Sequence, residues 1–95
     1  SAGLDYPCVS PLHCFLKETK RARYTSATDE EALEAFQLVS KNEGFVSPSL
    51  EPSHAFAEAI KIAPKLSKDT IIVVDSCGDS AKDSKIIAER LGYKI

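Results

Sequence analysis

The chain has 95 residues and a mass of 10.3 kDa, which is enough for one compact domain and too short for two hydrophobic cores. Its hydrophobic fraction of 43% and charged fraction of 27% are typical of globular proteins and exclude a disordered chain. The formal net charge of −2 argues against a general attraction to nucleic acid or to an anionic membrane. We therefore expect a single domain over residues 1–95 that binds neither.

Apolar runs and cysteines bear on where the protein is found. The longest strongly apolar run is 71–74, far short of the roughly 20 residues that span a bilayer, and from the opening residues we expect no signal peptide. The three cysteines, Cys8, Cys14 and Cys77, are irregularly spaced and form neither a disulfide framework nor a C-x-x-C pair. A reducing, cytoplasmic environment is expected.

The first third of the chain predicts a loop, a short helix and a short strand. Residues 1–11 contain one glycine and two prolines, which favour an irregular loop. A helix is expected from Pro11 to near Lys20, because apolar residues recur there at helical spacing. Residues 23–27 are a short strand candidate.

The middle of the chain predicts two helices around a short strand. Thr28 and Glu31 fit a capping box, so a helix should begin there and end at Gly44. Phe45 and Val46 suggest a strand of two to four residues. A second helix is expected from Glu51-Pro52 to about Pro64.

The last third predicts a buried strand and a final helix. Residues 70–75 are a β-branched run with consecutive apolar positions, which indicates a central strand of a parallel sheet. Ser80 and Asp83 can form a capping box for a helix that ends at Gly92. Because strands alternate with helices, we expect an α/β three-layer unit with a short parallel sheet, ordered βαβαβα after an N-terminal loop and helix.

Three turns should share the carboxyl edge of such a sheet, where ligands collect: 26–28, 47–51 and 76–80. The small, polar, glycine-containing turn 76–80 suits a ligand oxygen or ring nitrogen, but from the pattern alone backbone geometry is the better explanation. His13 and His54 lack partners at metal-ligand spacing. Lys82 is unusual because it is a positive charge at a helix start, although a solvated side chain is the better explanation.

Several motifs resemble the C-terminal part of tryptophan synthase β chains, in order over essentially the whole chain. They are residues 1–7 (SAGLDYP), 26–36 (SATDEEALEAF), 43–44 (EG), 50–51 (LE), 53–55 (SHA) and 71–74 (IIVV), with Gly78 and 82–83 (KD). The resemblance implies a lyase of the pyridoxal-phosphate fold type II class in amino-acid biosynthesis. It condenses L-serine with indole to give L-tryptophan and water.

The resemblance also implies roles for individual residues. Asp5 would help to close the site over the substrate adduct, and Glu51 would lie near the 3-oxygen of the cofactor ring. Cys77 would meet the pyridine nitrogen of the cofactor, with Gly78 beside it. The backbone carbonyls of Tyr6 and Cys8 would bind an activating monovalent metal cation.

Two departures from the family pattern affect the cofactor turn. Cys77 replaces a serine, and a thiol is a much weaker hydrogen-bond partner than a hydroxyl. Asp75 and Asp79 place negative charge where the family has an amide and an arginine. Residues 47–52 also form a turn one residue longer than in the family.

The resemblance further implies that the Schiff-base lysine and the phosphate-binding glycine loop lie upstream of this segment. We therefore expect that the isolated chain binds no pyridoxal phosphate and is inactive. Expected partners are the N-terminal part of the β chain, a tryptophan synthase α subunit, or a second copy through self-association. An alternative is a non-catalytic domain that acts as a binding or interaction module.

Overall fold

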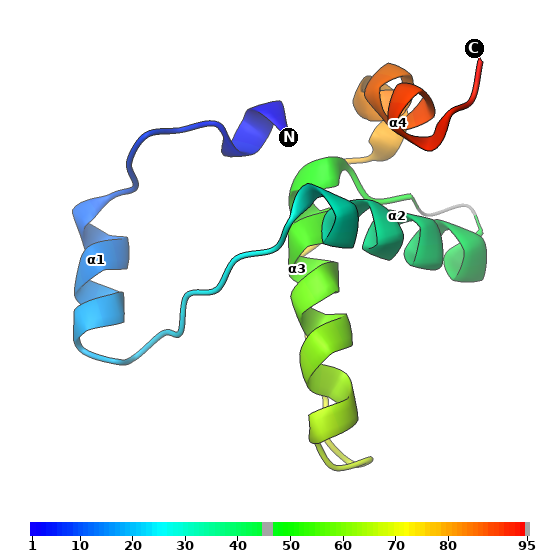
Figure 1. Ribbon diagram of the computed structural model, residues 1–95. Coiled ribbons are helices and arrows are strands. Elements are labelled where there is room, and N and C mark those ends of the chain that lie inside the picture. The colour runs from blue at the N-terminus through cyan, green and yellow to red at the C-terminus, as the bar shows by residue number, and fades with distance from the viewer. Residues whose placement is uncertain (45–46, 95) are drawn as a thin grey trace.

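The computed structural model describes residues 1–44 and 47–94. Figure 1 shows helices α2 and α3 crossing near the centre, α4 beside their junction, and α1 standing away from them. The helices are α1 (Pro11–Glu18), α2 (Asp29–Glu43), α3 (Leu50–Ile62) and α4 (Ser84–Leu91), with short 3-10 helices η1 (Ala2–Leu4), η2 (Ala63–Lys65) and η3 (Ser80–Asp83).

Helix α2 begins and ends as its sequence predicts. The Oγ1 atom of Thr28 accepts a hydrogen bond from the Glu31 amide at 3.2 Å, and the Glu31 carboxylate accepts one from the Thr28 amide at 3.5 Å. Gly44 follows the last helical residue with a positive φ of 74°, which an L side chain rarely adopts. The predicted capping box and glycine stop are confirmed.

Small side chains allow α2 and α3 to pack closely. Ala32 and Ala35 on α2 and Ala57 on α3 are at most 3% exposed. At the edge of this contact, Lys61 on α3 forms an ion pair with Glu31 on α2. Leu50, Ile87 and Ala88 extend the buried apolar set toward α4, so the core lies where the three helices meet.

The predicted parallel sheet is wrong. Among residues 1–44 and 47–94 the structure contains no β-ladder, and the one strand-like pairing is an isolated antiparallel bridge between Pro48 and Asp79. Residues 23–28 and 70–77, which include two of the predicted strands, have no regular secondary structure. The third strand candidate, Phe45-Val46, lies outside the described residues. The α/β three-layer prediction is therefore replaced by a helical arrangement.

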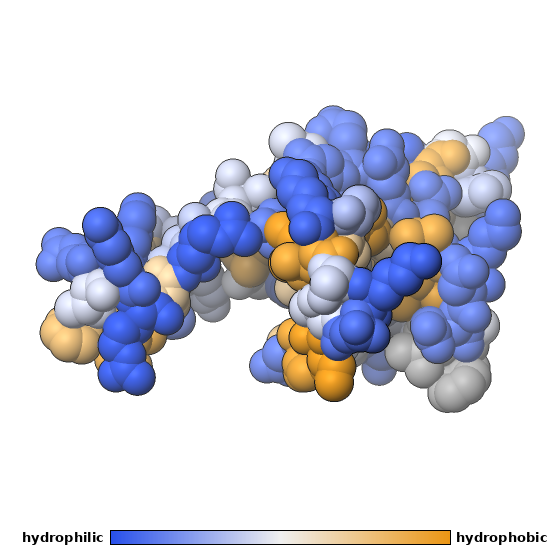
Figure 2. Space-filling view, turned by 90° about the horizontal axis from the view of Figure 1, so that it is seen from below, coloured by the Kyte–Doolittle hydropathy of each residue, from blue (hydrophilic) through white to orange (hydrophobic). Residues whose placement is uncertain are grey.

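The physical reason is that a strand requires a neighbour, whereas sequence composition only favours extended backbone. Ile71 and Val73 are 87% and 88% exposed, although their run predicted burial on both faces. The segments 25–27 and 72–75 both line a groove of 390 Å³ along α3. Figure 2 shows apolar side chains exposed over the central part of the molecule.

The molecule is more extended than its length suggests. Its radius of gyration is 14.8 Å, against about 12 Å for a compact domain of this size. Figure 1 shows the cause, because α1 projects from the body on two stretches of chain without regular structure. In the part of the chain that the structure describes, no helix has the length and hydrophobicity needed to cross a membrane.

Candidate functional site

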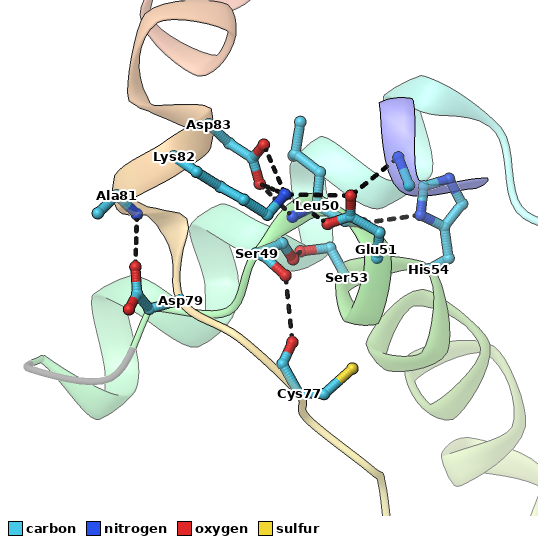
Figure 3. A network of polar contacts seen from close by, with 11 residues as sticks. Ser49, Leu50, Glu51, Ser53, His54, Cys77, Asp79, Ala81, Lys82 and Asp83 are labelled. Atoms are coloured by element: carbon cyan, nitrogen blue, oxygen red, sulfur yellow. Dashed lines mark hydrogen bonds and ion pairs between the residues drawn. The ribbon is translucent and has the colours of Figure 1, made fainter. Parts of the chain in front are cut away.

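A polar network surrounds the first turn of α3 (Figure 3). The ammonium group of Lys82 lies 3.0 Å from Oε1 and 2.9 Å from Oε2 of Glu51. The backbone amide of Gly3 donates a hydrogen bond to Oε1 of the same carboxylate at 3.1 Å. Glu51 therefore joins three segments of the chain: the N-terminal η1, the start of α3 and η3.

Asp83, which immediately precedes α4 (Ser84–Leu91), completes this network. Its Oδ2 atom accepts a hydrogen bond from the Leu50 amide at 2.9 Å, and its two oxygens lie 2.9 and 3.1 Å from the Lys82 ammonium group. The N-cap residue of α3, Ser49, makes no side-chain cap. Asp83 thus satisfies an amide at the N-terminus of α3, where the helix dipole favours a carboxylate.

Ser49 instead holds the turn that carries Cys77 and Gly78. Its hydroxyl donates to the Cys77 carbonyl at 3.2 Å. Gly78 has a φ of 81°, and a Cβ atom there would lie 3.2 Å from the Ser49 Oγ atom. Backbone conformation and space therefore both favour glycine at this position.

Two of the three turns predicted to share one edge do meet. The Ser80 amide donates to the Ser47 carbonyl at 3.2 Å, next to the bridge between Pro48 and Asp79. Residues 47–51 and 77–80 therefore lie side by side without a sheet to align them. Ser49 links the Cys77 turn to the Glu51 cluster, as Figure 3 shows.

The N-terminal segment lies against this cluster. Asp5 lines an open polar hollow of 470 Å³ together with Asp29 and His54, and Gly3 joins the segment to Glu51. Asp29 is the first residue of α2, so the hollow also places the helix that follows the predicted turn 26–28 next to the N-terminal segment. Asp5 and Glu51, the two expected catalytic residues, thus lie in segments that the Gly3 hydrogen bond connects.

The predicted cation ligands, the carbonyls of Tyr6 and Cys8, follow Asp5 in an exposed stretch where Tyr6 is 76% exposed. Across 1–44 and 47–94, no group of three or more His, Cys, Asp or Glu side chains is placed to hold a metal ion. Because the expected ligands are backbone carbonyls, the monovalent cation site stays a prediction.

Charge pairing dominates the electrostatics of the network. The hydrogen bonds from Lys82 lower the pKa of Glu51 to about 2, from an ordinary value of 4.5. The Glu51 and Asp83 carboxylates in turn raise the pKa of Lys82. At neutral pH the Glu51 carboxylate and the Lys82 ammonium group are therefore both charged.

Sequence reasoning missed the partner of Asp83. The predicted capping box between Ser80 and Asp83 is wrong, because Asp79 caps η3 through a hydrogen bond from the Ala81 amide at 2.8 Å. Asp83 reaches Leu50 instead, 33 positions away. The unusual charge of Lys82 was a usable signal, but no local pattern pointed to Glu51.

Several tryptophan synthase β chains are strongly similar to this chain over its full length. It is 57% identical over 95 residues to the tryptophan synthase β chain of Ruegeria sp. (strain TM1040) and 56% identical to that of Cereibacter sphaeroides. With the Fusobacterium nucleatum protein it shares 53% identity over 94 residues. The chain belongs to the tryptophan synthase β-chain family.

Within this tryptophan synthase family, the chain corresponds to a C-terminal portion. It is covered to 99–100% in these alignments but spans 22–24% of the length of the relatives. No protein-family model matches it. Two hydrogen bonds connect the segments to which the resemblance assigned site residues: Gly3 to Glu51, and Ser49 to Cys77.

The residues present fit the ring side of the family's cofactor, pyridoxal phosphate. The Cys77 thiol is free and exposed, and it lies on a turn that Ser49 and the positive φ of Gly78 hold in place. Figure 3 shows the Cys77 side chain beside this turn, with Ser49 between the turn and the Glu51 cluster. Because the thiol is exposed, a ring nitrogen has room to approach it.

Proposed function

We propose that the chain forms the C-terminal wall of the active site in a tryptophan synthase β-like enzyme that condenses L-serine with indole. The observation that supports this most strongly is the Glu51 carboxylate, which bonds to Gly3 at 3.1 Å and to Lys82 at 2.9 Å. The Gly3 bond connects Glu51 to the segment that carries Asp5, and the family resemblance assigns these two residues to one site. The cofactor-binding lysine and the phosphate loop would come from other β-chain polypeptide.

In this proposal each side chain has a separate task. Pyridoxal phosphate, when bound, supplies an electron sink for reactions at the amino-acid carbon atoms. Glu51, ionised at neutral pH, contacts the 3-oxygen of the ring, while the Cys77 thiol faces the ring nitrogen as a weak hydrogen-bond partner. Gly78 keeps the turn open beside it, and Asp5 closes the site over the substrate.

The exposed apolar segment supports the proposed partners. Ile71 and Val73 lie open to solvent beside the 390 Å³ groove along α3, as expected of a surface that further β-chain polypeptide covers. In isolation the same surface would favour self-association. Contact with an α subunit, a monovalent cation at Tyr6 and Cys8, and a cytoplasmic location complete the proposal by analogy with the family.

A chimera tests the function directly. The matched C-terminal segment of the Ruegeria sp. relative is replaced by this chain, and tryptophan formation from serine and indole is measured with pyridoxal phosphate present. We expect turnover well above background, and a loss of about 100-fold or more in kcat for Glu51→Gln. Glu89→Gln, an exposed change on α4, is the matched control and should leave the rate unchanged.

The alternative, a non-catalytic binding module, has support from the altered Cys77, Asp75 and Asp79 positions. It predicts a folded chimera that binds pyridoxal phosphate but forms no tryptophan, and this result would contradict our proposal. The isolated chain mixed with pyridoxal phosphate provides the second comparison. Serine consumption by that mixture would contradict the proposed need for a lysine from other polypeptide.

A further inference from the structure

Lys82 occupies a position between two carboxylates from different parts of the fold. Its ammonium group is within 3.0 Å of both oxygens of Glu51 and within 3.1 Å of both oxygens of Asp83. Glu51 belongs to the first turn of α3, whereas Asp83 immediately precedes α4. One cation therefore ties together the starts of two helices.

The geometry suggests orientation rather than core packing as the role of Lys82. Its side chain is 56% exposed, whereas the side chains of Glu51 and Asp83 are 20% and 10% exposed. Asp83 is itself fixed by the Leu50 amide. Lys82 thus contributes little apolar surface to the core. It makes two contacts with the partly buried Glu51 carboxylate, and Asp83 holds the lysine in place.

A contact with Lys82 would fix the orientation of the Glu51 carboxylate. Its carboxylate can rotate about the side-chain bonds, and a group that acts on a cofactor must keep one orientation to be effective. The Gly3 amide bonds to Oε1 alone, whereas Lys82 bonds to both oxygens. In the described part of the chain, Lys82 is the cation in contact with Glu51.

We propose that Lys82 is a positioning residue, which holds the Glu51 carboxylate in its working orientation while Asp83 fixes the lysine. This inference rests on the proposed function, because it gives Glu51 a role beside the cofactor. The lowered pKa of Glu51 and the raised pKa of Lys82 agree with a close pair of opposite charges. Lys82 itself needs no contact with substrate.

The first experiment measures the pair without relying on catalysis. The chimera carries ¹³C-labelled glutamate, the Glu51 signal is assigned with Glu51→Gln, and the pKa of the carboxyl is followed by NMR. Lys82→Met should raise it from about 2 toward 4.5, and Lys82→Arg should keep it low. Lys85→Met, on the exposed side of α4, is the control. An unchanged pKa in Lys82→Met would overturn the inference.

The second experiment measures the consequence for turnover in the same chimera. Lys82→Met should lower kcat by about tenfold or more while the KM for serine changes by less than about threefold. Lys82→Arg should recover most of the loss, and Lys85→Met should have no effect. If Lys82→Met fails to fold, Lys82→Gln provides the same comparison with a polar end group retained.

The outcomes separate this inference from the proposed function. If Glu51→Gln leaves turnover intact, the role of Glu51 fails, whatever its pKa does in the lysine variants. If Glu51→Gln abolishes turnover but Lys82→Met and Lys82→Gln leave kcat unchanged, the positioning role of Lys82 fails alone. Loss of kcat with rescue by arginine supports both.

Discussion

The Oδ2 atom of Asp83 accepts a hydrogen bond from the Leu50 amide at 2.9 Å, so α3 receives its cap from a residue 33 positions further along the chain. Asp83→Ala should lower the free energy of unfolding by about 1 to 2 kcal/mol, because a buried amide loses its partner. Urea denaturation measures the change. Asp69→Ala, on an exposed turn, is the control, and equal stability of the two variants would contradict the proposed cap.

The cap of α2, unlike that of α3, comes from the residue that directly precedes the helix. Thr28→Ala removes the hydroxyl that accepts from the Glu31 amide at 3.2 Å and should cost about 1 kcal/mol of stability. The same urea experiment applies, with Ser26→Ala in the exposed preceding segment as the matched change. If Thr28→Ala is no less stable than Ser26→Ala, the capping box contributes nothing measurable.

Glu51 should make stability depend on pH in the acidic range. Its pKa falls to about 2 in the folded protein, from 4.5, because of the Lys82 hydrogen bonds. The folded state therefore binds this proton less readily than the unfolded state, so the contribution is complete above pH 4.5 and is lost as the pH falls toward 2.

The size of this contribution should be about 1 kcal/mol, since the exposed lysine is screened by solvent. Unfolding free energies near pH 7 and near pH 3 give the measurement. Glu51→Gln should show a smaller difference between the two conditions than wild type, whereas Glu89→Gln should match wild type. An identical pH dependence in Glu51→Gln would contradict the assignment.

The exposed segment predicts self-association of the isolated chain. Val73 is 88% exposed in an unpaired apolar stretch, so copies should pair through it as their concentration rises. Sedimentation velocity should show a rising average mass for wild type and a smaller rise for Val73→Lys. Gln37→Lys adds the same charge on exposed α2 and should behave as wild type. Association that is equally strong in Val73→Lys would exclude this surface.

Local patterns predicted the helices because their causes are local. The Thr28 and Glu31 pair marks a helix start wherever it folds, and Gly92 ends α4 with a φ of 79° as expected. Residues 70–75 show the opposite case. Their β-branched composition favours extended backbone, but pairing depends on a neighbouring strand that residues 1–44 and 47–94 do not supply.

The candidate site likewise has residues that were predicted from the sequence and contacts that were not. The family resemblance pointed to Glu51 and to the Cys77 turn, and periodicity alone pointed to neither. The link between Lys82 and Glu51 spans 31 positions, and the cap from Asp83 to Leu50 spans 33. Such pairs follow from how the helix starts are brought together, which no spacing rule along the chain encodes.

Thiol reactivity measures whether the Cys77 turn faces the cofactor ring, as we propose. In the chimera, the alkylation rates of Cys77 and Cys14 are followed by peptide mass spectrometry with and without pyridoxal phosphate. Both thiols are exposed in the free chain, so each should react readily at first. Pyridoxal phosphate should slow the modification of Cys77 by about tenfold or more and leave Cys14 unchanged. Equal rates at Cys77 with and without saturating cofactor would contradict this placement of the Cys77 turn.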